Sequence, residues 1–174
     1  MGYDLRRHEL TSFKRAIALA ATLALFPAAA HAGTATSNLS VTATVTANCT
    51  VSTAAVAFGN VNTISGSNVD GSGGITVTCT NGTTWTAAAG VGSGTGATFA
   101  SRKMASGGNL LNYSLYTDSG RTSIWGDGSA GNVTIGGAGN GAAQNVTVYG
   151  RVAAGQTSVP AGSYSDTVSV TVTY

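Results

Sequence analysis

Charged side chains are scarce in this sequence: only 8% of its 174 residues are Asp, Glu, Lys or Arg. Half of the eight Lys and Arg residues, together with both histidines, fall within the first 32 residues. The rest of the chain carries four basic and four acidic side chains and so has no net charge. This composition excludes the basic stripe that nucleic-acid binding requires, and we expect no nucleic-acid partner.

Histidine and glutamate are absent beyond residue 32. Without histidine, neither a Ser-His-Asp nor a Cys-His arrangement can form. Paired-carboxylate chemistry would need two of only four aspartates, and Asp118, Asp127 and Asp166 stand beside Gly, Ser or Thr, where aspartate usually shapes turns and strand starts. We therefore expect that the protein is not an enzyme and that it binds no cofactor or metal.

The first 32 residues have the features of a secretory signal peptide. Their basic side chains are Arg6, Arg7, Lys14 and Arg15. Residues 16–30 are apolar apart from Thr22, and Ala30-His31-Ala32 fits the cleavage motif of small residues. An uncleaved membrane anchor is the alternative, but fifteen mostly alanine residues are short for a bilayer. We expect export, cleavage after Ala32, and a mature chain of 142 residues, which is 174 less 32.

Only two cysteines are present, Cys49 and Cys79. An even pair in an exported chain favours one disulfide, and two free buried thiols are the alternative. The spacing excludes a C-x-x-C redox or zinc site. A bond between them would close a loop of about 31 residues, which loop entropy converts into roughly 3.5–4 kcal/mol of stability.

No segment after the leader combines a 3.6-residue apolar period with helix caps, and glycine-rich turn signals punctuate the chain. Alternating apolar and polar residues instead predict a series of short strands. The predicted strands are 51–58, 74–80, 84–89, 113–117, 123–125, 132–135, 145–152 and 165–174. This spacing predicts one all-β domain, an antiparallel sandwich of the immunoglobulin type. We interpret the glycine-rich run 90–96 as a flexible loop, because no helix follows to make a phosphate site.

The longest alternating pattern runs from Ala35 to Cys49, directly after the leader. Every second residue is apolar except Ser37, and every residue between them is polar. Strict period two indicates an extended strand with one buried face, but about fifteen residues is roughly twice the common strand length. Either two strands lie in line, or the first half pairs with something outside its own domain.

Several short motifs follow one another in a fixed order along the chain. They are Asn48-Cys49-Thr50-Val51, Ala57-Phe58-Gly59, Ile75-Thr76-Val77-Thr78-Cys79, Tyr113-Ser114-Leu115-Tyr116-Thr117-Asp118, Trp125-Gly126-Asp127-Gly128, Val148-Tyr149-Gly150-Arg151-Val152 and Ala161-Gly162-Ser163-Tyr164-Ser165-Asp166-Thr167-Val168. Each is weak alone. Together, over residues 33–174, they resemble the spore coat protein U domain family, which is found in pilins of the archaic chaperone–usher pathway.

The resemblance implies an incomplete immunoglobulin-like antiparallel β-sandwich that lacks its last strand and is completed by donor-strand exchange. In this family a periplasmic chaperone fills the gap first, and at an outer-membrane usher the N-terminal extension of the next subunit replaces it. Carried onto this chain, the resemblance implies a signal peptide at 1–32, a donor-strand extension at 33–46 and a pilin domain at 47–174. It also implies that the two cysteines form a disulfide.

The alternation assigns candidate residues to both sides of such an exchange. The donor strand would use Leu39, Val41, Ala43 and Val45, and the C-terminal strand would present Val168, Val170, Val172 and Tyr174. Leu39 is the only large apolar side chain of a donor strand that is rich in Ala and Thr, so we expect small pockets or a loose grip.

The implied function is that of a structural pilin subunit. Such subunits polymerise head-to-tail into a surface fimbria that serves adhesion and biofilm formation. Its partners would be neighbouring pilin subunits, the chaperone and the usher. The alternative is a self-sufficient secreted coat protein or a small carbohydrate-binding module. The aromatic residues available for a sugar-binding face are Trp85, Tyr113, Tyr116, Trp125, Tyr149 and Tyr164.

Overall fold

The computed structural model of the protein describes residues 32–174. The predicted signal peptide lies outside the described residues except for Ala32. The chain divides into two units between Thr42 and Ala43. In the first unit, residues 32–42 are exposed and form no regular secondary structure. Within the described residues, no helix is long and apolar enough to cross a membrane.

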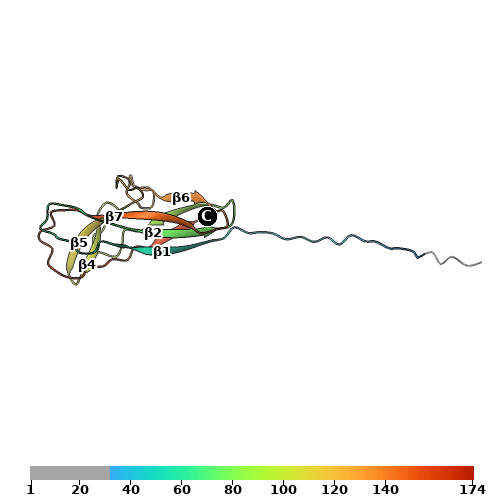
Figure 1. The fold of residues 1–174 in the computed structure, drawn as a ribbon, viewed down its shortest axis with the longest axis horizontal. Helices are drawn as coiled ribbons and strands as arrows, with labels where there is room; N and C mark the ends of the chain where they lie inside the picture. The colour runs from blue at the N-terminus through green and yellow to red at the C-terminus, as the bar shows by residue number, and fades with distance from the viewer. Residues whose placement is uncertain (1–31) are drawn as a thin grey trace, which may run out of the picture. The chain divides into compact units, whose positions relative to one another are not determined.

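The second unit is built of antiparallel strands, and residues 43–174 contain no helix. The strands are β1 (Cys49–Ala57), β2 (Val69–Cys79), β3 (Thr84–Ala89), β4 (Arg102–Ser106), β5 (Asn109–Tyr116), β6 (Ile135–Ala138), β7 (Gln144–Val152) and β8 (Val170–Thr173). One sheet has the order β1-β2-β7-β5-β4 and the other has the order β6-β3-β8 (Figure 1). The predicted all-β antiparallel fold is confirmed.

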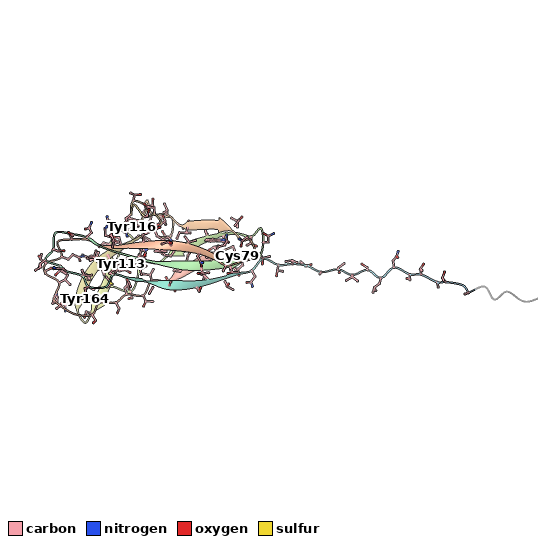
Figure 2. All side chains as sticks on the ribbon, viewed as in Figure 1. Cys79, Tyr113, Tyr116 and Tyr164 are labelled. Atoms are coloured by element: carbon pink, nitrogen blue, oxygen red, sulfur yellow. A yellow bond between two sulfur atoms is a disulfide. The ribbon has the colours of Figure 1, made fainter. Side chains whose placement is uncertain are left out.

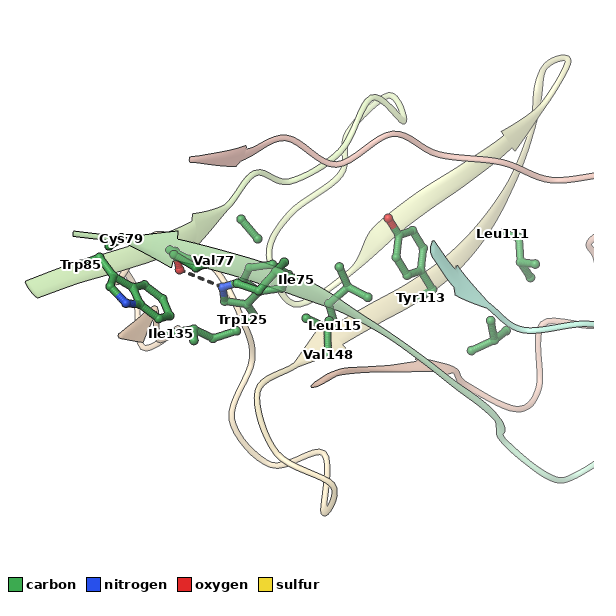
Figure 3. Packing of buried hydrophobic residues seen from close by; sticks show 13 residues of the cluster. Ile75, Val77, Cys79, Trp85, Leu111, Tyr113, Leu115, Trp125, Ile135 and Val148 are labelled. Carbon is green, nitrogen blue, oxygen red and sulfur yellow. Dashed lines mark hydrogen bonds between the residues drawn. The ribbon is translucent and has the colours of Figure 1, made fainter. Parts of the chain in front are cut away.

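The core lies between the two sheets, where alternate residues of each strand point inward. Buried side chains come from β2 (Ile75, Val77, Cys79), β3 (Trp85, Ala87, Ala89), β5 (Leu111, Tyr113, Leu115) and β7 (Val148, Val152). Figure 3 shows several of them in one continuous row. Each large apolar side chain buried here contributes about 1.5–3 kcal/mol.

Trp125 joins the two sheets. Its side chain is buried, and its Nε1 donates a hydrogen bond of 3.0 Å to the carbonyl of Ala87 on β3 (Figure 3). Its backbone amide donates to the carbonyl of Leu115 on β5 at 2.9 Å. Because both polar groups are satisfied, Trp125 fills the space between the sheets without leaving an unpaired donor.

The stretch Gly71-Ser72-Gly73-Gly74 is one of the glycine-rich turn signals, and the predicted strand began only at Gly74, but all four residues form part of β2. The β1 strand has a bulge between Ala54 and Ala57, where its register with β2 shifts. A Cβ at Gly73 would lie 2.6 Å from the carbonyl oxygens of Ala54 and Ala55. These glycines therefore let the bulged strand approach β2 closely.

Strand β4 was absent from the predicted strands. It begins with two cations, Arg102 and Lys103, and has no apolar alternation, although Arg102 is fully buried. It pairs with β5 across the two-residue turn Gly107-Gly108, in which Gly107 has a φ of 58°. The predicted strands 123–125 and 132–135 are wrong in extent, because Trp125 and Val133 form only an isolated bridge and the regular strand β6 starts at Ile135.

The Cys49–Cys79 disulfide predicted from the sequence is present. The two residues face each other at the start of β1 and the end of β2, so the bond fixes the first residue of the edge strand to the inner strand. In the loop-entropy model this cross-link stabilises the fold by restricting the unfolded chain.

We predict that replacing both cysteines by alanine lowers the free energy of unfolding by about 3–4 kcal/mol. Guanidinium denaturation of the purified, oxidised protein measures this loss, and the double substitution leaves no unpaired thiol. Mass measurement before and after reduction is the control for the native bond. Two free thiols in exported material would contradict the assignment.

Candidate functional site: an open groove between two sheet edges

The two sheets each end in an edge strand on the same side of the sandwich. In the five-stranded sheet this edge is β1, and in the three-stranded sheet it is β8. Within the described residues neither strand has a second partner on its outer side. The fold is therefore open at the position where one further strand would join the two edges.

A groove of about 410 Å³ lies between these edges. One wall is formed by residues 53–58 of β1 and the loop after it, and the other by residues 164–170, which lead into β8. Its floor consists of core side chains, namely Ile75, Leu115, Trp125 and Val148. Apolar side chains that would otherwise be covered by a strand are accessible here from one side.

The predicted C-terminal strand 165–174 is regular only at Val170–Thr173. Val168 and Val170 line the groove, and Val172 packs against the core. Val168 precedes the regular strand, and Tyr174 follows it with 56% of its surface exposed. The observed strand is shorter than the predicted one because the residues before Val170 have no continuous neighbouring strand with which to form a ladder of hydrogen bonds.

The C-terminal segment (residues 164–174) is instead held by separate contacts along one edge. Ala105 and Ser165 exchange two backbone hydrogen bonds of 2.8 and 3.1 Å. The amide of Gly90 donates to the carbonyl of Ser169 at 2.9 Å, and β3 pairs with β8 from Val170 onward. All of these contacts use the edge that faces β3 and β4, so the edge that faces the groove stays unpaired.

Asp166 fixes the start of this segment. One carboxylate oxygen accepts hydrogen bonds from the amide and hydroxyl of Ser93 and from the amide of Thr167, each at 2.7 Å. The other accepts a 2.7 Å hydrogen bond from the hydroxyl of Tyr113 on β5. A Cβ at Gly92, whose φ is 92°, would collide with this carboxylate. The glycine-rich loop that we interpreted as flexible therefore closes tightly around Asp166.

Arg102 supports the same region from inside the core. Its guanidinium is fully buried and donates to the carbonyls of Gly90, Phe99 and Trp125 at 3.0, 3.0 and 2.7 Å. Burial lowers the pKa of this guanidinium, an effect that nearby Tyr113 and Asp166 oppose. Since all three acceptors are backbone carbonyls, Arg102 connects the loop after β3 to the groove floor at Trp125.

Asp166 is held in its charged form. Burial alone would raise the pKa of Asp166, but the hydrogen bonds from Ser93, Tyr113 and Thr167 outweigh it and leave the pKa below its usual range. Burial, reinforced by the hydrogen bond to Asp166, raises the pKa of Tyr113, so this phenol remains a donor at every physiological pH. Neither Asp166 nor Arg102 could be assigned these roles from sequence, because nothing around them marks Arg102 as buried or Asp166 as the acceptor for a distant loop.

The four predicted donor-strand residues do not occupy any groove in the described structure. Leu39, Val41 and Val45 are 87, 84 and 83% exposed, and Ala43 is exposed as well. None of them lies in a regular strand. The long alternating pattern thus becomes β1 only from Cys49 onward.

The six aromatic residues considered for a sugar-binding face do not gather on one surface. Trp85, Tyr113 and Trp125 belong to the buried core. Tyr116 and Tyr149 are paired across β5 and β7, where the guanidinium of Arg121 lies 5.7 Å from the Tyr149 ring centre. In residues 32–174, no three His, Cys, Asp or Glu side chains come together as a metal site would require.

We predict that Asp166→Asn destabilises the fold by about 1.5–3 kcal/mol, the usual worth of hydrogen bonds to a charged group. Because the folded-state pKa of Asp166 is depressed, the ionised carboxylate stabilises the fold above its ordinary pKa of about 3.9. That contribution disappears as the pH falls through the folded-state pKa, so the variant should lose less stability on acidification than the wild type.

Urea unfolding between pH 2 and 7 and hydrogen exchange of residues 165–169 measure these effects. Asp127→Asn is the matched control, because Asp127 has a similarly lowered pKa but accepts its hydrogen bonds from Ser129 and Asn132 within its own loop. Equal exchange at residues 165–169 in the two variants would show that Asp166 does not position the segment.

Three comparisons place this fold among known proteins. The sequence matches the Spore Coat Protein U domain over residues 35–171. A search of the curated proteins gave no match. Among solved structures, the fold is similar to a chain in the crystal structure of the CsuC–CsuE chaperone–tip adhesion subunit pre-assembly complex from archaic chaperone–usher Csu pili of Acinetobacter baumannii, with a TM-score of 0.55 and 22% sequence identity.

That structural match covers 75% of this chain and 40% of the matched chain. The likeness supports the all-β sandwich described above. The family match is more extensive, because it includes nearly every residue that follows the predicted leader. The chain belongs to the Spore Coat Protein U domain family.

Proposed function

We propose that the protein is a structural pilin subunit of an archaic chaperone–usher fimbria. Its groove accepts the N-terminal extension of another copy, and its own extension enters the groove of a third. The observation that carries this proposal is that one chain contains both an open groove and an exposed alternating segment that could fill such a groove. It has a groove between two unpaired edges, and it has an exposed alternating segment with no apolar partner in the described structure.

The candidate donor segment and the groove wall have the same length. The candidate donor residues span Leu39 to Val45, seven residues, or about 20 Å in extended conformation. The groove wall on the C-terminal segment, residues 164–170, is also seven residues long. An inserted strand would pair with the free backbone edge and point its alternate side chains at the apolar floor, as in β-augmentation, of which pilin complementation is a known case.

Burial of the large donor side chains supplies the affinity. Leu39, Val41 and Val45 each contribute roughly 1.5–3 kcal/mol when their exposed surface is covered, and Ala43 contributes less. The polar residues between them, Ser40, Thr42 and Thr44, would face away from the floor. Since the donating and accepting surfaces of one copy differ, the association is head-to-tail, and it produces a fibre wherever the rotation between successive copies does not close a ring.

An unfilled groove also accounts for the proposed partners. Before assembly, two free edges over an apolar floor would favour aggregation, so a periplasmic chaperone would need to cover them. The matched solved structure is, by its title, a chaperone–subunit pre-assembly complex. We propose export to the periplasm, capture by such a chaperone, assembly at an outer-membrane usher, and a cell-surface fimbria that serves adhesion and biofilm formation, with no catalytic role.

We predict that deleting residues 33–44 leaves a folded subunit that binds its chaperone but forms no fibres. Fibres are counted by electron microscopy after co-expression with the chaperone. A length-preserving test replaces Leu39, Val41 and Val45 by serine, and its matched control replaces Ser40, Thr42 and Thr44 by alanine on the opposite face. The serine variant should fail to assemble, while the alanine variant should assemble.

Normal fibres from the deletion variant would refute the donor-strand role of the extension. A stable soluble monomer without any chaperone would instead favour the self-sufficient secreted module.

A further inference from the structure

A second cavity lies at the end of the sandwich where β1 finishes and the C-terminal segment begins. It holds about 870 Å³ and is bounded by residues 56–64, by residues 159–164, and by Met104 and Leu111. Four of its lining residues, Val56, Phe58, Met104 and Tyr164, also line the groove. The cavity, which we call the distal cavity, is therefore a continuation of the groove beyond its walls.

The distal cavity has the chemistry of a protein contact. Val61 and Val159 pack partly buried inside it, and neither loop, 56–64 or 159–164, contains a charged side chain. Ile64 lies on its lining with 80% of its surface exposed, among the most exposed large apolar side chains of the domain. A hollow that mixes apolar side chains with uncharged polar ones such as Asn60 and Asn62, and that has an exposed isoleucine on its lining, favours another uncharged protein surface over a small ionic ligand.

The direction of an inserted strand determines at which end of the groove the donor copy lies, and so whether that copy is next to the distal cavity. The bulge in β1 between Ala54 and Ala57 interrupts a regular ladder on that wall, so an inserted strand pairs mainly with the C-terminal segment. Antiparallel pairing is slightly more stable per residue than parallel pairing. The C-terminal segment runs from Tyr164 toward the end marked by Cys79, and Figure 2 shows these two residues at opposite ends of the domain. An antiparallel donor strand therefore leaves the groove at the distal cavity.

The donor copy cannot then be far away. Only Thr46, Ala47 and Asn48 separate Val45, the last candidate donor residue, from Cys49 at the start of β1. Four residue steps span at most about 14 Å. Asn48 is also held to its own domain, because its carbonyl accepts a 2.9 Å hydrogen bond from the amide of Thr80 and its amide donates a 3.1 Å hydrogen bond to the hydroxyl of Thr80.

We infer that the distal cavity is the seat of a second subunit contact, in which it is covered by the proximal end of the next copy. That proximal surface consists of Asn48, the turn 80–83 and the loop 139–143. It contains no charged side chain, and Ala142 and Ala143 are exposed on it. The inference rests on the proposed function, and it adds that two uncharged surfaces meet outside the groove and fix the angle between successive subunits.

Hydrogen exchange on two assemblies tests this contact. In the first, the full-length mature chain is refolded with an excess of a synthetic peptide of residues 35–46, which fills the groove and blocks polymerisation. In the second, the same chain is assembled into fibres. We expect residues 165–170 to exchange more slowly in both, and residues 57–64 and 139–143 to exchange at least about tenfold more slowly only in fibres.

The possible outcomes separate the two claims. Groove protection in both assemblies without slower exchange at 57–64 in fibres would overturn the distal contact and leave the proposed function intact. Slower exchange at 57–64 with the peptide alone would also overturn it, because the donor strand itself would then fill the cavity. Absence of groove protection in both assemblies would overturn the proposed function and this inference together.

A substitution gives an independent measurement. Ile64→Asp places a charge in the proposed contact, and because Ile64 is 80% exposed the isolated fold should tolerate it. We expect unchanged peptide binding but fibres that dissociate at a lower guanidinium concentration than wild type. The matched control is Thr147→Asp, on the exposed outer face of β7. Equal stability of the two variant fibres would contradict the contact.

Discussion

Two neighbouring strand edges of this sandwich, β1 and the C-terminal segment, have backbone groups with no partner on their outer side within residues 32–174. Beneath them lie side chains of the core itself, including Ile75 and Trp125, so the groove opens directly onto the packing between the two sheets. The remaining contacts at the site keep these two edges in place. The disulfide fixes one edge, and the Asp166 and Arg102 contacts fix the other.

The polar contacts behind the C-terminal segment explain how an edge without a ladder keeps its position. Regular strand begins only at Val170, yet Ser165, Asp166 and Ser169 are each hydrogen-bonded to the loop after β3 or to β4. Gly92 lets that loop reach the carboxylate. The wall is thus assembled from three segments far apart in sequence, which leaves its other edge free along the groove.

Alternation and turn chemistry were sufficient to predict the all-β fold, most of β2, β3 and β7 and the second half of β5, because those strands have one buried and one exposed face. The disulfide was predicted from a pair of cysteines in a chain with a predicted signal peptide. The same rules failed where the role of a residue depends on contacts with segments distant in sequence. The stretch Gly71-Ser72-Gly73-Gly74 has the composition of a turn but accommodates the bulge of β1, and Arg102 begins a strand that no apolar alternation marks and is buried among backbone carbonyls. The alternating residues 35–45 suggested a groove, because they form a strand pattern that the domain itself does not need. The walls of the groove could not be predicted, because they are held by contacts between segments distant in sequence.

The position of the disulfide has a mechanical consequence. A pull on the extension reaches the domain at Asn48 and is transmitted to Cys49, the first residue of an edge strand that has a single neighbour. Without a cross-link such a load would peel β1 from β2 one hydrogen-bonded pair at a time. The covalent bond to Cys79 transmits the load directly to β2, an inner strand that is paired on both sides. The force is then shared by several strands of the sheet instead of acting on the edge strand alone.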